Sequence, residues 1–181
     1  MIIKKLLLFF LLSISISASS ASINELFSAA IFGKTERVKF LLSEGTDVNG
    51  VTGTGRTAMM AACFNGNVRV VRILLAYGAN VNIVDSLGST ALMDAVVFGS
   101  EELVELLITA GADVTIKDKQ NISVIEKAKK TKYDNIVKIL EKSIATKEEK
   151  RATKENSESE LTEGTKKPAE DSEDKSAETK E

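Results

Sequence analysis

Residues 57–82 read TAMMAACFNGNVRVVRILLAYGANVN, and residues 90–115 read TALMDAVVFGSEELVELLITAGADVT. The second stretch follows the first at a shift of 33 residues, and no gap is needed to align them. Weaker copies in the same phase precede and follow them. A fixed period of this length is typical of solenoid proteins, in which each copy packs only against its neighbours. We therefore expect about four copies, at residues 22–50, 51–83, 84–116 and 117–142.

Each copy predicts two short helices. Thr57 and Thr90 are suited to cap the first helix, and Gly66 and Gly99 end it. The second helix carries apolar residues at the helical period, which make one apolar stripe; in copy two these are Val70, Val71, Leu74 and Leu75. A glycine follows each second helix, where a left-handed C-cap favours this residue; these glycines are Gly45, Gly78 and Gly111.

This pattern resembles the ankyrin repeat, a 33-residue unit of a β-turn and two antiparallel helices. The family's T-P-L-H-x-A-A is seen as TAMMAAC at residues 57–63 and as TALMDAV at residues 90–96. Its V-V-x-x-L-L-x-x-G-A-D-V-N is seen as VVRILLAYGANVN at residues 70–82. The resemblance covers residues 23 to about 142. It implies an all-α ankyrin-repeat solenoid with short β-turn or hairpin connections.

Two departures from the family pattern bear on stability. The family's Pro is Ala58 and Ala91 here, and its His is Met60 and Met93. In the family that His helps a hydrogen-bond network between adjacent repeats, whereas Met supplies packing only. We therefore expect modest stability, and cooperative melting well above ~65 °C would contradict this.

The outer copies are expected to act as caps, because the ends of a stack need a polar outer face. In copy one, Asn24 stands where Thr57 and Thr90 stand in the central copies. In copy four, Lys132 replaces the glycine of Gly66 and Gly99. The first helix of copy four also carries Lys127, Lys129 and Lys130, and Glu141 stands where an apolar residue stood.

Residues 1–21 are predicted to be a signal peptide. Lys4 and Lys5 precede an apolar run at residues 6–12, and small residues close the segment, which is the three-part pattern of a secretory leader. Cleavage is expected after Ala21, with cleavage after Ser20 as the alternative and an uncleaved anchor as a further one. The apolar run is too short for a mature transmembrane helix, so we expect no stable membrane span after leader removal. The predicted location is periplasmic or secreted.

Residues 143–181 are predicted to form a disordered charged tail. They hold 8 basic and 12 acidic groups, and Leu161 is the only large apolar residue after Ile144. Such a segment buries too little surface to offset the entropy of ordering it. A helical start over residues 147–154 is possible. The tail is either a tether or a solubilising end, and its mixed charge favours the second.

Composition excludes most catalytic chemistry. The chain has no His and one Cys, so catalytic triads with His, imidazole metal sites, intrachain disulfides and multi-Cys zinc clusters are excluded. Residues 22–142 hold 14 basic and 14 acidic groups, and this neutrality argues against nucleic-acid binding. We expect no enzyme activity, no cofactor and no metal. Cys63 is interpreted as core filler, with a reactive thiol as the alternative.

Three further features have structural explanations. The glycine-rich run at residues 50–55 lacks a following Gly-Lys-Ser/Thr and falls in an inter-repeat turn, which argues against nucleotide binding. An acidic cluster suits the start of a helix; it comprises Glu101, Glu102 and Glu105. Residues 121–123 match a glycosylation sequon, relevant only in a source that glycosylates secreted proteins.

The resemblance implies where a partner binds. In ankyrin proteins, partners meet the turn tips and the exposed ends of the first helices, which line a concave side. Carried over by phase, the candidate residues are Ile31, Phe32, Thr54, Arg56, Phe64, Asn65, Leu87, Ser89, Val97 and Phe98. In copy four the same positions are Lys119, Gln120, Ile122, Lys130 and Thr131. Apolar and aromatic residues at exposed positions often mark an interface. The alternative for Phe64 and Phe98 is that the rings fill gaps between helices.

The sequence therefore predicts a monomeric, non-enzymatic module that binds a protein partner through the concave face of stacked repeats, outside the cytoplasm. The alternative is an exported effector or toxin antagonist that binds a protein in another cell. No small-molecule substrate and no nucleic acid is expected.

Overall fold

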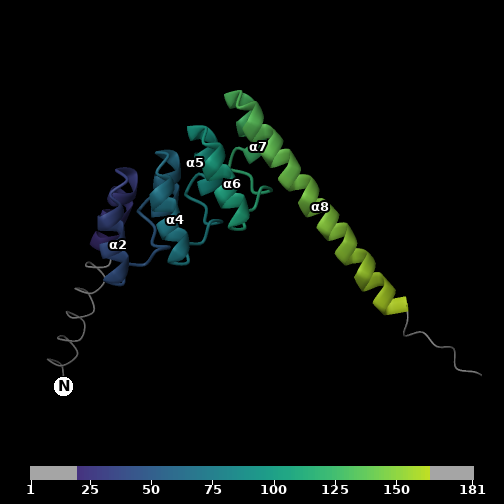
Figure 1. Cartoon of the computed structure of the whole chain (residues 1–181), viewed down its shortest axis with the longest axis horizontal. Coiled ribbons are helices and arrows are strands. Elements are labelled where there is room, and N and C mark those ends of the chain that lie inside the picture. The colour runs from purple at the N-terminus through teal and green to yellow at the C-terminus, as the bar shows by residue number, and fades with distance from the viewer. Residues whose placement is uncertain (1–19, 164–181) are drawn as a thin grey trace, which may run out of the picture. The chain divides into compact units, whose positions relative to one another are not determined.

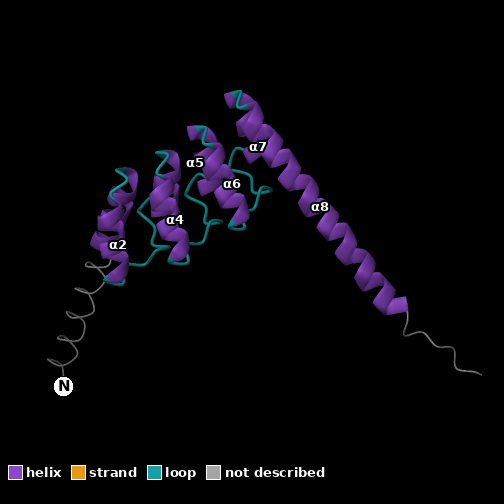
Figure 2. Ribbon diagram, in the orientation of Figure 1, coloured by secondary structure: helices purple, strands orange, loops and turns teal. Residues whose placement is uncertain are grey.

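The computed structural model describes the backbone of residues 20–163 and the side chains of residues 20–149. The predicted leader therefore lies almost entirely outside the described residues. The described part is built from helices and turns, with two isolated β-bridges (Figure 2). A helix over residues 20–31 comes first. It is followed by α2 (Thr35–Ser43), α3 (Ala58–Phe64), α4 (Val68–Ala76), α5 (Ala91–Phe98), α6 (Glu101–Thr109), α7 (Val124–Thr131) and α8 (Asp134–Glu163).

Helix pairs stack in chain order (Figure 1). The first helix of each copy contacts the first helix of the next, as α3 does with α5 and α5 with α7. The second helices form a parallel row, in which α2 contacts α4 and α4 contacts α6. This two-row arrangement confirms the all-α repeat fold predicted from the 33-residue period. Each copy packs against its neighbours, and these contacts bury the apolar faces of the solenoid.

The first helices of copies two and three begin where the sequence predicts, whereas the first helix of copy one already includes residue 20 and so begins before Asn24. The Thr57 hydroxyl accepts a hydrogen bond from the Met60 backbone N–H at 3.2 Å, and the Thr90 hydroxyl accepts one from Met93 at 3.3 Å. In copy four, Ser123 forms a capping box with Glu126. These side chains satisfy backbone donors that the first turn leaves without a helical partner.

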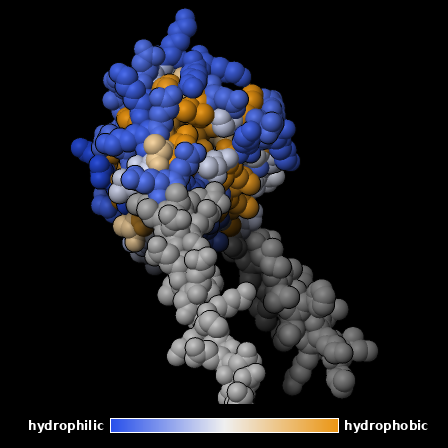
Figure 3. Space-filling model, turned by 90° about the vertical axis from the view of Figure 1, so that its right-hand side faces the viewer, coloured by the Kyte–Doolittle hydropathy of each residue, from blue (hydrophilic) through white to orange (hydrophobic). Residues whose placement is uncertain are grey.

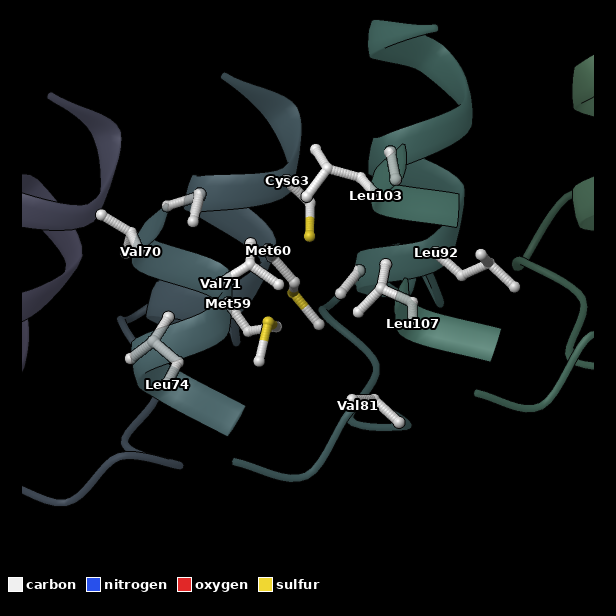
Figure 4. Packing of buried hydrophobic residues seen from close by; sticks show 14 of the residues in the cluster. Met59, Met60, Cys63, Val70, Val71, Leu74, Val81, Leu92, Leu103 and Leu107 are labelled. Atoms are coloured by element: carbon white, nitrogen blue, oxygen red, sulfur yellow. The ribbon is translucent and has the colours of Figure 1, made fainter. Parts of the chain in front are cut away.

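The core lies between adjacent copies (Figure 4). Met60 and Cys63 of α3 point toward the neighbouring copy, where Leu103 and Leu107 of α6 face them (Figure 4). Met60 is 1% exposed and Cys63 is fully buried. Burying a Met or Leu side chain contributes about 1.5–3 kcal/mol. Apolar contact therefore fills the position that His holds in the ankyrin pattern.

Asparagine side chains supply polar links between copies. Asn49 Oδ1 accepts a hydrogen bond from the Asn80 backbone N–H at 2.7 Å, and Asn82 Oδ1 accepts one from Asp113 at 2.7 Å. Asn67 Nδ2 reaches back one copy and donates to the carbonyl oxygens of Ala30 and Ile31, each at 2.8 Å. The copies are thus joined by hydrogen bonds that do not need the family's His.

Backbone hydrogen bonds also join the turns that precede the first helices. The Ser86 N–H donates to the Thr54 carbonyl at 3.0 Å, and the Lys119 N–H donates to the Leu87 carbonyl at 2.9 Å. Each bond runs from the turn of one copy to the turn of the copy before it. We call residues 52–56, 85–89 and 118–122 the turn row.

Copy four ends the repeat body differently from its predecessors. Lys132, at the position of Gly66 and Gly99, has φ of 60°, which is the left-handed region. Helix α8 then continues past the predicted boundary at residue 142 and reaches Glu163. No Gly or Pro interrupts residues 134–163, and Ala, Lys and Glu favour helix. The expected helical start at residues 147–154 lies inside this helix, and residues 164–181 lie outside the described residues.

The chain divides into two compact units, one up to Ile144 and one from Ala145 onward. The repeat body belongs to the first unit. The described part of the second unit, residues 145–163, is the later part of α8.

Candidate functional site: the first-helix face

The surface formed by helix 20–31, α3, α5 and α7, by the residue that directly follows each of these helices, and by the turn row is called the first-helix face below. It holds all ten residues predicted to contact a partner. Five of them are large apolar residues with much of their surface exposed: Phe32 (68%), Phe64 (50%), Leu87 (69%), Val97 (46%) and Phe98 (48%). Thr54 and Asn65 are also exposed, whereas Ile31, Arg56 and Ser89 are partly buried.

A shallow pocket of about 200 Å³ lies on this face between copies one and two. It is lined by Phe27, Ile31, Arg56, Ala61, Phe64 and Asn65. The Arg56 guanidinium carbon lies 5.8 Å from the centre of the Phe64 ring, a distance at which a cation is attracted to the ring face. The pocket is therefore apolar with one cationic group at its wall, and it suits an apolar side chain.

Phe64 and Phe98 are neither fully exposed interface residues nor rings buried between helices, which were the two alternatives left open by the sequence. Phe64 lines the pocket with half of its surface exposed. The Phe98 ring packs over Gly66 of the preceding copy while 48% of the residue stays exposed. Phe98 thus contributes to the contact between copies as well as to the surface.

Arg56 binds two carboxylates of the next copy. Its Nη2 lies 2.7 Å from Asp94 Oδ2, and its Nη1 lies 3.3 Å from Asp85 Oδ2. The carboxylate side chains are nearly buried, at 7% and 3% exposure, and that of Arg56 is 26% exposed. One guanidinium therefore offsets two carboxylates within a small buried volume.

This imbalance is reflected in the titration of Asp94. Burial raises the pKa of Asp94 from its ordinary value of 3.8 to about 6, against the lowering effect of Arg56 and with a further rise from Asp85. Asp85 in addition accepts hydrogen bonds from the backbone N–H groups of Leu87 and Ser89, at 2.8 and 2.9 Å. The network therefore fixes the turn of copy three as well as the position of Arg56.

Copy four keeps the turn of copy three but carries a basic residue at the helix position where copy three has Asp94. Asp118 occupies the position of Asp85 and accepts from the backbone N–H groups of Gln120 and Ile122. Lys127 occupies the position of Asp94 and binds Asp118 at 2.7 Å. The Lys127 hydrogen bond is the main reason that the pKa of Asp118 is lowered. Arg56, Asp94 and Lys127 therefore alternate in charge along the stack.

The pairing of Arg56 with Asp94 was missed by sequence reasoning, which placed Arg56 on the surface and read Asp94 only as part of a repeat motif. A signal was present. Asp94 is the one charged residue in ALMDAVVF, residues 91–98, and such a residue in an apolar helix has to be paired when it is buried. Its partner lies 38 residues earlier and cannot be identified from spacing within one copy.

The other chemistry-bearing groups have structural roles. Burial, together with the Asp94 charge, raises the pKa of the Cys63 thiol, which suits core packing and not reactivity. In the acidic cluster, Glu102 binds Arg72 at 3.0 Å, and Glu101 accepts a hydrogen bond from Asn135 Nδ2 at 2.9 Å. Among the residues that the structure describes, no three His, Cys, Asp or Glu side chains gather as metal ligands would.

Figure 3 shows hydrophobic surface bounded by hydrophilic side chains on the repeat body. Within residues 20–163, no helix is long and apolar enough to span a bilayer. The two rows of helices and the turn row define a helical repeat protein. A family model described as ankyrin repeats, in three copies, matches residues 26–118. The chain therefore belongs to the ankyrin repeat family.

A search of curated proteins found no match. Ankyrin repeats are protein–protein interaction modules and are typically non-enzymatic. The family match ends at residue 118, and the structure continues the same helix pairing through α7 and α8. Copy four is thus a structural continuation of the repeats beyond the matched part.

Proposed function

We propose that this chain binds a partner protein through its first-helix face and does so outside the cytoplasm. The observation that carries the proposal is the exposed apolar surface that runs across three copies. It begins at the pocket beside Phe64, continues through Val97 and Phe98, and includes Leu87 at the tip of the turn row.

The energetics favour this face as an interface. An exposed aromatic or aliphatic side chain contributes about 1.5–3 kcal/mol when a partner covers it fully. Aromatic residues are also over-represented among the few positions that dominate binding energy. The pocket between Ile31 and Phe64 offers a place for an apolar anchor of the partner.

The binding test is affinity capture from an envelope extract of the source cells with three variants. Phe64→Ser and Leu87→Ser remove exposed apolar groups from the first-helix face. Phe40→Ser is the matched control, because Phe40 is 50% exposed on α2, in the other row of helices. We expect a partner retained by the wild-type chain and by Phe40→Ser to be lost with the two face variants, while circular dichroism stays unchanged.

Equal retention by all variants would refute the assignment of this face. Loss of helical signal in Phe64→Ser would instead assign that ring to the fold, and Leu87→Ser then decides the question, since Leu87 is 69% exposed at a turn tip.

The location rests on the sequence of residues 1–21, with two lysines, an apolar run and small residues at the end. Fractionation of expressing cells, followed by N-terminal sequencing, tests it. A mature chain in the periplasm or medium that begins at Ser22 is expected. An unprocessed chain in the cytosol would overturn the location. Recovery from inside a contacted cell would point to an exported effector.

A further inference from the structure

The charge of the repeat body changes sign along the stack. Residues 22–116 hold six Lys and Arg against ten Asp and Glu, whereas residues 117–142 hold eight Lys against four Asp and Glu. The body is neutral as a whole, so the charge is separated along the direction in which the copies stack. Copy four is its basic end.

The same asymmetry holds on the first-helix face. At the position where copies one to three carry Ile31, Phe64 and Val97, copy four carries Lys130. At the turn tip, Lys119 follows Leu87 in the turn row and is joined to it by a backbone hydrogen bond of 2.9 Å. Both lysines are exposed, whereas Lys127 is held by Asp118 at 2.7 Å. The face therefore runs from an apolar pocket in copies one and two to two exposed lysines of copy four, one in the turn before α7 and one near the end of α7.

We infer that the occupant of this face is a protein segment with an apolar anchor residue and a separate cluster of acidic residues. The inference rests on the proposed function and specifies the chemistry of the partner. The anchor enters the pocket beside Phe64, and the carboxylates lie against Lys119 and Lys130. Charge complementarity of this kind sets the orientation and register of a bound segment.

The separation of the two sites sets the spacing in the partner. Packed helices lie about 8–10 Å apart, so two copies correspond to roughly 20 Å. An extended chain advances about 3.3 Å per residue. The acidic cluster is therefore expected about six residues from the anchor when the segment is extended.

Selection from a library of random 16-residue peptides displayed on phage tests the chemistry directly, with the purified chain as bait. We expect enriched peptides to combine Leu, Ile, Phe or Trp with at least two Asp or Glu at roughly this spacing. One enriched peptide, labelled with fluorescein, then gives Kd by anisotropy at low and high salt. Enriched peptides without acidic residues would overturn the inference.

Charge reversal locates the acidic end of the peptide. The double variant Lys119→Glu, Lys130→Glu is expected to weaken binding about tenfold or more and to abolish its salt dependence. Each lysine is also reversed singly, and Lys138→Glu is the matched control for the single variants, since it reverses one lysine of copy four on α8, outside the first-helix face. A peptide with Lys in place of Asp and Glu should prefer the double variant. If Lys138→Glu weakens binding as much as either single variant on the face, the assignment is refuted.

Failure of this inference can be told apart from failure of the proposed function. If Phe64→Ser abolishes peptide binding while the lysine variant does not, the face binds but its partner is not acidic. If Phe64→Ser has no effect, the face itself is wrong. Two other occupants of the face are tested in parallel, and a positive result for either overturns the inference. A lipid surface is indicated if anionic vesicles bind the chain while no peptide is selected. The chain's own residues 164–181 are indicated if a peptide binds only after these residues are deleted.

Discussion

The ring of Phe98 covers Gly66 of the preceding copy so closely that a Cβ on Gly66 would collide with it. Tyr133 covers Gly99 in the same way one copy later, although it comes from a different position in its repeat. In copies two and three, the glycine at the end of the first helix is therefore also the surface on which an aromatic ring of the next copy lies. Helix termination and contact between copies depend on the same residue.

Gly66→Ala is expected to destabilise the chain by at least about 2 kcal/mol. The left-handed conformation at φ of 71° costs Ala about 1–2 kcal/mol, and the collision with Phe98 adds to this. Urea unfolding followed by circular dichroism measures the change.

Gly78→Ala is the control for the backbone effect alone, since Gly78 has φ of 80° and no heavy atom within 4 Å of an added Cβ. Its expected cost is the backbone contribution alone, about 1–2 kcal/mol. Adding Phe98→Ala to Gly66→Ala should recover part of the steric loss. Equal destabilisation by the two glycine variants would show that the ring contact has no energetic weight.

Arg56→Ala is expected to cost about 3–5 kcal/mol, because it leaves the buried carboxylates of Asp85 and Asp94 without their counter-ion. Arg72→Ala removes an exposed pair with Glu102, whose side chains are 58% and 60% exposed, and should cost no more than about 1 kcal/mol. Thermal melts of the two variants decide the matter. Similar melting temperatures would show that the Arg56 network is not stabilising.

The raised pKa of Asp94 leads us to expect that the free energy of unfolding increases as the pH is lowered. The folded chain holds its proton more tightly than the unfolded chain, because the pKa of Asp94 rises from 3.8 to about 6 on folding. Stability from this group is therefore gained as pH falls through 6 and is complete near pH 4. A shift of about two units corresponds to roughly 3 kcal/mol. The free energy of unfolding, measured in urea from pH 7.5 to pH 5, should rise in this window.

Asp94→Asn is the matched variant, since it keeps the shape and an oxygen acceptor for Arg56 but cannot ionise. Its free energy of unfolding should vary much less over the same range. The lowered pKa values of Asp118 and Glu126 act in the opposite direction only when the pH approaches their ordinary values of 3.8 and 4.5. Parallel curves for the wild type and Asp94→Asn would contradict the proposed titration.

Lys132→Gly is expected to stabilise copy four by about 1 kcal/mol. Lys132 ends α7 in the left-handed conformation, with φ of 60°, where glycine has no Cβ penalty. The matched change at Lys129, Lys129→Gly, lies inside α7 and should destabilise by about 1 kcal/mol. Opposite signs for the two variants in urea unfolding confirm the argument, and the same sign in both contradicts it.

The repeat period was sufficient to predict the paired helices of the central copies and the threonine caps of their first helices. The spacing of Thr57 and Thr90 and the apolar stripes behind them depend on local chain geometry, and the structure confirms both. Positions of the first-helix face were likewise found by phase, because equivalent residues in a stack share a surface. Whether these positions contact a partner stays a prediction.

Contacts that differ between copies could not be predicted from the period. Ala61, Asp94 and Lys127 are equivalent in phase, yet only Asp94 reaches Arg56. The period describes only what the copies share. Which side chains of neighbouring copies meet depends on how one copy is rotated relative to the next. The end of α8 at Glu163 was missed for another reason. Composition indicated low hydrophobic burial after residue 142, but residues 134–163 contain no Gly or Pro to end the helix and are rich in Ala, Lys and Glu.

The hydrogen bonds within the turn row have a consequence for the kinetics of partner binding. Because Ser86 is tied to Thr54 and Lys119 to Leu87, the tips are anchored to one another before any ligand arrives. A turn row that is already ordered loses little conformational entropy when a partner binds to it. Tight complexes of this protein should then form by near rigid docking, with affinity differences that reside in the dissociation rate.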